Sequence, residues 1–175
     1  VDILRKGGID NISIDLIYGF PEQTVDEWQM DIDHAIELSV SHLSAYSLMY
    51  EEGTSLYKML KQGKIKEIDE NVSLAMYKTL VKSMKDAGYE HYEISNFAKP
   101  GMRAMHNSSY WDDTPYIGIG AAAHSYNRKS RQWNVSDIKK YIEATNNDVI
   151  LAEQETIDDD THYNDLITKA LRTSE

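Results

Sequence analysis

The sequence predicts an α/β fold built on a parallel sheet, and three neighbouring segments carry this prediction. Residues 11–18 alternate in polarity and are rich in isoleucine, which is typical of a strand. A helical pattern follows at residues 24–38, and a second strand-like segment follows at residues 42–49. Strand, helix and strand in this order form a βαβ unit, whose strands are parallel and whose functional edge lies at their carboxyl ends.

The first strand is expected to divide its side chains between two faces, because alternate residues of a strand point to opposite sides. The two sets are Ile12, Ile14 and Leu16 on one face and Ser13, Asp15 and Ile17 on the other. Asp15 then points to the inner face of the sheet, where an unpaired carboxylate is costly. Two interpretations stay open: Asp15 contacts a hydroxyl or ammonium group of a ligand, or backbone groups of a neighbouring loop satisfy it.

The first helix is predicted from Thr24 and Glu27, which have the spacing of a capping box. Gly19-Phe20-Pro21 before it makes a tight exit from the strand. Thr54 predicts the start of a short helix that ends at Gln62. Asp69 predicts the start of a longer helix that ends at Gly88, and a third short strand is expected at residues 89–95.

The second half of the chain has weaker patterns. Residues 97–115 are expected to be mostly loop, and Ser136 is predicted to cap a helix that runs to Thr145. Residues 118–123 are rich in glycine and alanine, which suits either close approach to a ligand or close packing, and they lack the third glycine of a dinucleotide fingerprint. The acidic stretch from Glu153 to Asp160 is interpreted as solvated surface and as a boundary, after which another subdomain begins.

Composition limits the possible functions. The net charge of -11 argues against a general affinity for nucleic acid or for an anionic membrane surface. The absence of cysteine excludes disulfides, thiolate zinc sites and cysteine-ligated iron–sulfur clusters within these residues. No apolar run approaches the length of a membrane span and no signal peptide opens the chain, so a cytoplasmic protein is expected.

The densest polar and aromatic sequence runs over residues 91–97 and then over residues 106–111. If the turn at His106 is helical, His106 and Tyr110 share a face and Trp111 lies beside them. Such a set suits a flat aromatic ligand whose metal takes an imidazole, as heme does. The alternative is an aromatic corner with a hydrogen-bonded histidine, and spacing alone leaves both interpretations open.

Several motifs in register resemble one known family. These are residues 12–24 (ISIDLIYGFPEQT), 51–54 (EEGT), 87–98 (AGYEHYEISNFA), His106-Asn107 with Tyr110-Trp111, and 118–126 (GIGAAAHSY). Together they resemble the oxygen-independent coproporphyrinogen III oxidases and their heme-chaperone relatives, over almost the whole chain.

The resemblance implies the C-terminal part of a partial (β/α) radical S-adenosylmethionine (SAM) barrel with parallel strands, followed by an α+β extension. The implied divisions are residues 1–98 for the barrel portion, 99–150 for the extension and 151–175 for the truncated start of a helical domain. Both ends of the chain are expected to be those of an excised piece, which should leave an exposed sheet edge or apolar face.

The resemblance also implies cofactors. The family holds SAM and a [4Fe–4S] cluster, whose three ligands are cysteines of a Cys-x3-Cys-x2-Cys loop that this chain lacks. Asp15 matches a SAM-binding position, and Met49, Ala123 and His124 match positions that line the SAM cavity. This chain alone is therefore expected to be inactive in radical chemistry.

The family has two branches, one that decarboxylates coproporphyrinogen III and one that binds heme and delivers it to a recipient protein. The motif of His106, Asn107, Tyr110 and Trp111 resembles the chaperone branch, with His106 as the ligand of the heme iron. The alternatives are the coproporphyrinogen dehydrogenase, whose ligand is a porphyrinogen, and an α/β fragment in which protein groups fill the polar faces around Asp15 and His106.

Overall fold

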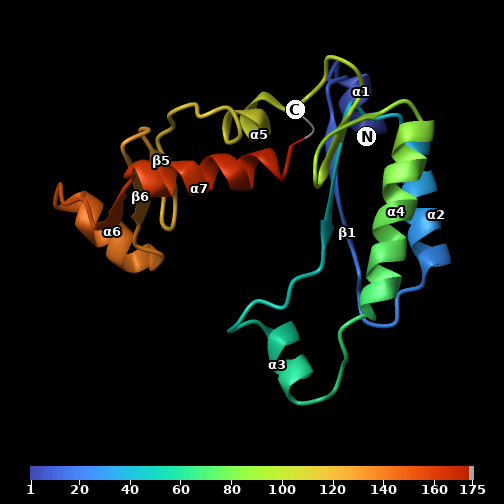
Figure 1. Cartoon of the computed structure of the whole chain (residues 1–175), viewed down its shortest axis with the longest axis horizontal. Helices are drawn as coiled ribbons and strands as arrows, with labels where there is room; N and C mark the ends of the chain where they lie inside the picture. Colours follow the sequence, from blue (N-terminus) through green and yellow to red (C-terminus); the bar gives the residue numbers. More distant parts are fainter. Residues whose placement is uncertain (174–175) are drawn as a thin grey trace. The chain divides into compact units, whose positions relative to one another are not determined.

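The structure is a computed structural model and describes residues 1–173. The described chain forms two compact units, Val1–Ala104 and Met105–Thr173 (Figure 1). The first unit contains one sheet with its covering helices, and the second contains a smaller sheet with three helices.

The first unit contains a mixed four-stranded sheet in the order β1-β2-β4-β3. β1 and β2 are parallel, whereas β4 pairs antiparallel with both β2 and β3. Its elements are α1 (Asp2–Lys6), β1 (Ser13–Tyr18), α2 (Val25–Glu37), β2 (His42–Ser47), α3 (Ser55–Lys61), α4 (Glu70–Asp86), β3 (Glu90–Glu93) and β4 (Asn96–Ala98). The predicted βαβ unit and the predicted α/β class are confirmed.

The helices of this unit begin where the sequence predicts. The Thr24 hydroxyl accepts the Glu27 backbone N–H, and the Glu27 carboxylate accepts the Thr24 N–H in return. Thr54 caps α3 by accepting from Tyr57, and Asp69 caps α4 by accepting from Asn71. These side chains satisfy backbone donors that the first helical turn leaves without partners.

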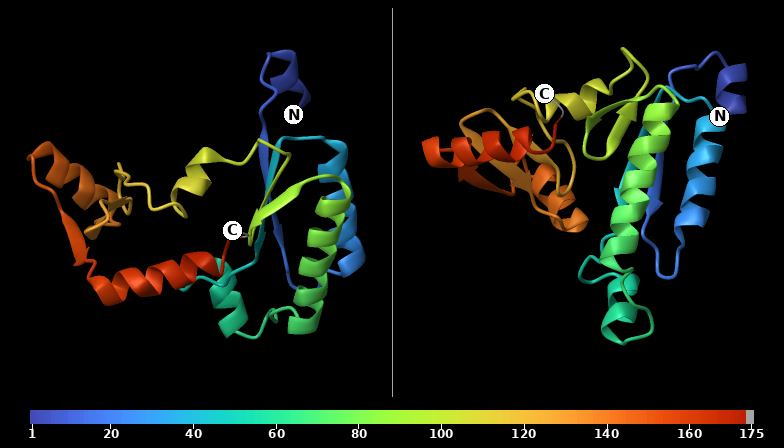
Figure 2. Two further views of the ribbon diagram at one scale, coloured as in Figure 1. Left: turned by 45° about the horizontal axis from the view of Figure 1, so that its top comes forward. Right: turned by 45° about the vertical axis from the view of Figure 1, so that its right-hand side comes forward.

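Helices α2 and α4 lie side by side and cover one face of the sheet (Figures 1 and 2). The fully buried side chains between these layers are Trp28, Ile32, Leu43, Met76, Leu80, Met84 and Phe97. The indole N–H of Trp28 donates to the Met76 carbonyl at 3.1 Å, so this buried donor is satisfied and fixes α2 against α4. The Asp15 side of β1 faces away from this core.

The predicted strand at residues 89–95 is present as β3 but ends earlier than predicted, at Glu93. It is the first strand of a hairpin, because the chain turns at Ile94-Ser95 and returns as β4, which was not expected. The Glu93 carboxylate accepts the backbone N–H of Ser95 at 2.7 Å and thus stabilises the turn. The register shifts between His91 and Glu93, so Tyr92 leaves the ladder and points to the inner face, where it meets His42.

The second unit contains an antiparallel sheet in the order β5-β6-β7. Its elements are α5 (Met105–Ser109), β5 (His124–Tyr126), β6 (Ser130–Asn134), α6 (Ile138–Asn146), β7 (Ala152–Thr156) and α7 (Asp159–Ala170). The acidic stretch is mostly exposed, as expected, and it contains a strand, β7, that pairs with β6. One expectation needs correction, because α6 is capped by Asp137, which accepts from Lys139 and Lys140, rather than by Ser136.

Within residues 1–173 no helix is both long and apolar enough to cross a membrane. The expected exposed edge and apolar face are present in the first unit, because β1 ends the sheet and Ile17 and Tyr46 are exposed on the face opposite the helices. The last two residues of the predicted segment 151–175 lie outside the described residues.

Candidate functional site

A row of polar side chains crosses the inner face of the first sheet. The registers pair Asp15 with Ser44, Ser44 with Asn96, and Asn96 with Glu93, so each of the four strands contributes one residue. Asp15 is exposed, whereas Ser44, Asn96 and Glu93 are buried. The Asn96 side-chain amide donates to the Glu93 carboxylate at 2.6 Å. The row therefore presents one accessible carboxylate beside an ordered polar surface, which suits a ligand with hydroxyl or ammonium donors.

His42 lies on the same face of β2 as Ser44, two residues before it, and supports this row. The imidazole is buried, with Nδ1 2.8 Å from the Ser13 hydroxyl and Nε2 2.7 Å from the Tyr92 hydroxyl. Burial lowers the pKa of His42, while the charges of Asp15 and Glu93 oppose this shift. His42 is therefore a neutral link between two hydroxyl groups rather than a cation beside Asp15.

The predicted SAM-cavity residues fall in both units. Met49 follows β2 by two residues, in the unit of Asp15, and 72% of its surface is exposed. Ala123 and His124 belong to the second unit, where the Ala123 carbonyl accepts from Asn134 at 3.0 Å. The His124 ring stacks on Trp133 with centroids 6.0 Å apart, beside a groove of about 530 Å³.

His106 and its predicted neighbours lie in and just after α5, so this turn is helical as the interpretation required. The Tyr110 hydroxyl lies 3.2 Å from His106 Nε2, and the two rings meet edge to face with centroids 5.1 Å apart. Both side chains are exposed, whereas Asn107 and Trp111 are half-buried. The structure thus brings His106 and Tyr110 together at the surface, and both earlier interpretations of the pair remain compatible with this contact.

An aromatic path continues from this pair into the second unit. The Tyr110 ring meets Tyr116 at 4.9 Å, and Tyr116 meets Tyr126 at 5.9 Å between centroids. A cavity of about 190 Å³ lies along this path. Its lining includes Tyr110, Trp111, Tyr116, Tyr126, Arg131, Asp165 and Lys169. Trp111 thus contributes to a cavity beside the His106 pair, and Arg131 and Lys169 give this cavity a cationic wall.

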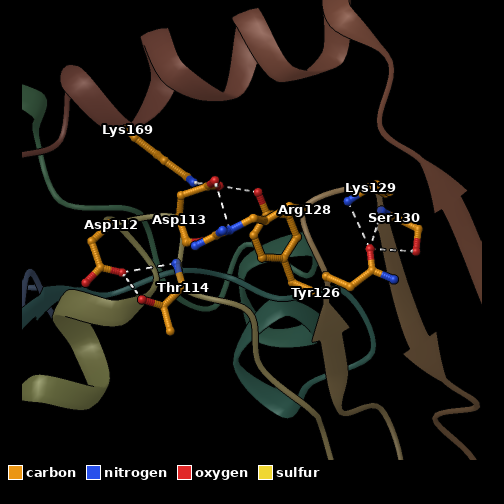
Figure 3. A network of polar contacts seen from close by, with 9 residues as sticks. Asp112, Asp113, Thr114, Tyr126, Arg128, Lys129, Ser130 and Lys169 are labelled. Atoms are coloured by element: carbon orange, nitrogen blue, oxygen red, sulfur yellow. Dashed lines mark hydrogen bonds and ion pairs between the residues drawn. The ribbon is translucent and has the colours of Figure 1, made fainter.

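Asp113 organises the polar groups behind this cavity (Figure 3). It accepts a short hydrogen bond from the Tyr126 hydroxyl and lies 3.3 Å from the Lys169 ammonium and 3.6 Å from Arg128. The Tyr126 hydrogen bond and these cations lower the pKa of Asp113. Burial and the Asp113 carboxylate raise the pKa of Tyr126 to about 12. Asp113 is therefore charged and Tyr126 neutral over the physiological range.

Close packing, rather than close approach to a ligand, explains the glycine at position 118. A Cβ on Gly118 would lie 2.1 Å from the backbone oxygen of His124. No real side chain tolerates such a contact, so Gly118 serves close backbone packing. The Gly118 N–H also donates to the Ser125 hydroxyl at 3.0 Å, and the Gly120 N–H donates to the Tyr141 hydroxyl at 3.0 Å.

Sequence reasoning missed most residues around these predicted positions. His42, Ser44 and Glu93 were not singled out as site residues, although the polar positions of the strand at 42–49 repeat every second residue as those around Asp15 do. Arg131 and Lys169 carried no local signal, because β6 and α7 bring them to Trp111 only in the folded unit.

The chain does not supply an iron–sulfur cluster site. It has no cysteine, and residues 1–173 contain no group of three or more histidine or acidic side chains placed to hold a metal ion. The cluster ligands of the radical SAM family therefore do not fit onto this chain, and no chemical step is assigned through a cluster.

Comparisons with known proteins connect these features to a family. A scan against protein-family models finds no match. The chain is 39% identical to the heme chaperone HemW of Bacillus subtilis over 139 residues. This match covers 79% of this chain and 37% of that protein. It is 37% identical over 144 residues to the heme chaperone HemW of Lactococcus lactis, covering 82% of this chain and 38% of that protein.

A solved structure shows the same fold. Coproporphyrinogen III oxidase HemN from Escherichia coli, described as a radical SAM enzyme, superposes with a TM-score of 0.75. The match covers 97% of this chain and 42% of that chain, at 20% identity. These matches confirm the resemblance predicted from the motifs: the chain corresponds to part of a HemW-like protein with the radical SAM fold. It spans less than two fifths of the length of the two HemW proteins.

Proposed function

We propose that this chain is part of a heme chaperone of the HemW type and that its Met105–Thr173 unit contributes heme contacts. The observation that carries the proposal is the His106–Tyr110 pair, an exposed imidazole on a short helix with an aromatic ring against it and Trp111 beside it. An exposed imidazole can reach the iron of a large planar ligand, and the aromatic side chains can pack against the macrocycle. In this proposal His106 ligates the iron and Asn107, Tyr110 and Trp111 contact the porphyrin.

The inner face of the first unit has a separate role in the proposal. Asp15 contacts SAM there, and Met49 of the same unit lines the cofactor cavity. Ala123 and His124, which belong to the second unit, are assigned by the proposal to the cofactor cavity of the longer protein. Support comes from the exposed Asp15 carboxylate at the end of an ordered polar row, because SAM carries hydroxyl and ammonium donors that a carboxylate accepts. The [4Fe–4S] cluster requires cysteines from other parts of such a protein, since this chain has none. The heme is passed to a recipient protein.

A hemin titration tests the heme assignment. The Soret band is followed while hemin is added to the purified protein and to His106→Ala, at a protein concentration low enough to prevent aggregation. We expect saturable one-to-one binding that falls by at least about tenfold in the variant, since an iron–imidazole bond is lost. The matched control is His162→Ala, because His162 is an exposed histidine on α7 of the same unit.

Unchanged binding by His106→Ala would remove His106 as the iron ligand. Decarboxylation of coproporphyrinogen by the longer protein, with SAM consumed, would instead favour the oxidase branch. Loss of binding in both His106→Ala and His162→Ala would indicate nonspecific adsorption of hemin and would contradict the proposal.

A further inference from the structure

Two buried N–H groups of the second unit have no acceptor. Among residues 1–173, neither the Trp111 indole N–H nor the Arg131 Nε–H makes a hydrogen bond, although both atoms are buried. The Glu155 carboxylate lies 3.3 Å from Arg131 Nε, but its direction does not allow a hydrogen bond. A buried donor without a partner costs about 1–3 kcal/mol, so two such groups in one small unit require an explanation.

Both residues line the same cavity. It measures about 190 Å³ and lies between the segment after α5, strands β5 and β6, and helix α7. Lys169 adds a cation to the wall, and its ammonium group has three protons, of which one donates to Asp113 at 3.3 Å. The wall therefore offers N–H groups that can donate hydrogen bonds to a group in the cavity.

The chemistry of these donors selects an anionic acceptor with more than one oxygen. Arg131 already holds the Asp165 carboxylate through Nη2 at 2.7 Å, and its Nε, 3.3 Å from the Glu155 carboxylate, still lacks a hydrogen-bond acceptor. A carboxylate can accept from the Arg131 Nε–H with one oxygen and from the Trp111 indole with the other. Asp165 pairs with Arg131 and Asp113 pairs with Lys169, so acidic partners already balance the charges of these two cations. The entering group therefore meets directed hydrogen-bond donors rather than a large excess of positive charge.

The size of the cavity limits what enters it. Whole small-molecule ligands occupy pockets of roughly 300–1,000 Å³, so a cavity of about 190 Å³ accommodates one arm of a ligand. Tyr110 connects this cavity to the proposed iron ligand, because it lines the cavity and its hydroxyl contacts His106. A ligand held at His106 can thus extend a side arm past Tyr110.

We propose that this cavity binds a carboxylate arm of the ligand, with Trp111 and Arg131 as hydrogen-bond donors and Lys169 as the neighbouring cation. The inference rests on the proposed function, in which the arm is a propionate of heme. It assigns a specificity role to residues of β6 and α7, which lie outside the His106 segment.

The test compares hemin with hemin dimethyl ester, whose propionates are esterified and uncharged, in the same dilute detergent. Both are titrated into the unmodified protein and into Arg131→Gln, Trp111→Phe and His106→Ala. We expect the ester to bind the unmodified protein about tenfold more weakly than hemin, which corresponds to about 1.4 kcal/mol. Arg131→Gln and Trp111→Phe should each reduce this preference for the acid, whereas His106→Ala should weaken the two ligands equally and keep it.

Arg131→Gln removes two ion pairs, so its folding is checked by circular dichroism. Trp111→Phe leaves these ion pairs intact and provides an independent variant. Equal binding of hemin and its ester by the unmodified protein would mean that only water fills the cavity and would overturn the inference, while the heme assignment stands. Failure of the unmodified protein to bind hemin would refute the proposed function and the inference together.

Discussion

The Nε2 atom of His42 lies 2.7 Å from the hydroxyl of Tyr92, and this contact joins β2 to the irregular part of the β3–β4 hairpin. Tyr92 is not aligned in the ladder, and its side chain reaches β2 through this contact. The Arg103 guanidinium lies over the Tyr92 ring at 5.5 Å. The buried histidine therefore adds a side-chain contact to the backbone pairing of β2 with β4.

Replacing His42 should destabilise the first unit in a pH-dependent way. His42→Ala removes the two hydrogen bonds of the buried imidazole, to the Tyr92 and Ser13 hydroxyls, which should cost about 2–3 kcal/mol of unfolding free energy at neutral pH. Because burial lowers the pKa of His42, the unfolded chain binds its proton more readily than the folded one. Stability should be complete above the ordinary imidazole pKa of about 6.5 and should fall as the pH drops below it.

Urea unfolding at neutral and mildly acidic pH measures this effect. The difference between the two conditions should shrink in His42→Gln, while His34→Gln, at an exposed position of α2, should retain most of it. An unchanged pH dependence in His42→Gln would contradict the assignment of this loss to His42.

Asn96→Asp should be severely destabilising. It removes the amide that donates to the buried Glu93 carboxylate at 2.6 Å and places a second negative charge against it. Breaking a buried charged contact in this way costs about 3–5 kcal/mol, and acidification should recover part of the loss as one carboxyl takes a proton. Urea unfolding at neutral and acidic pH measures the loss of stability and its partial recovery. Asn11→Asp, an exposed asparagine before β1, is the matched change and should cost little.

Gly118→Ala should disrupt the loop before β5. The new Cβ would lie 2.1 Å from a backbone oxygen, which cannot move away as a flexible side chain could. We expect a loss of about 3 kcal/mol or more in the stability of the second unit. Ser125→Ala is the comparison, because it removes only the hydroxyl that accepts from Gly118 and should cost about 1 kcal/mol. Equal losses in the two variants would show that the backbone approach is not the reason for glycine here.

Tyr126 should ionise late. Burial and the Asp113 carboxylate raise its pKa to about 12. The absorbance of the phenolate form measures this, and Tyr126→Phe should remove the late phase while Tyr163→Phe, at an exposed site, should not. Since the unfolded chain releases this proton near pH 10, the stability of the second unit should decrease as the pH rises above about 10.

The first half of the fold could be predicted because its signals are local. Thr24 and Glu27 are three residues apart, and their capping box forms from that spacing alone. The hairpin of β3 and β4 could not be predicted, because β4 has only three residues and its structure depends on its pairing with β2. Strands as short as Asn96–Ala98 carry no usable alternation, so tertiary pairing decides their structure.

The candidate sites divide in the same way. His106 and Tyr110 are four residues apart, so a helical turn was sufficient to predict their contact. The cavity that Trp111, Arg131 and Lys169 line is formed by three separate segments, and the local sequence does not predict it. The pairing of Asp15 with Ser44 lies between these cases, since the parallel pair was predicted but its register was not.

The two edges of the first sheet differ in how readily they accept a further strand. β3 has four residues and an irregular register, which are features that discourage edge-to-edge pairing. β1 has six residues in unbroken register with β2, so its outer edge offers a regular row of backbone donors and acceptors. Because β4 runs antiparallel to β2, the hairpin also interrupts the series of parallel strands on that side. The outer edge of β1 is therefore the edge at which a further strand pairs most readily.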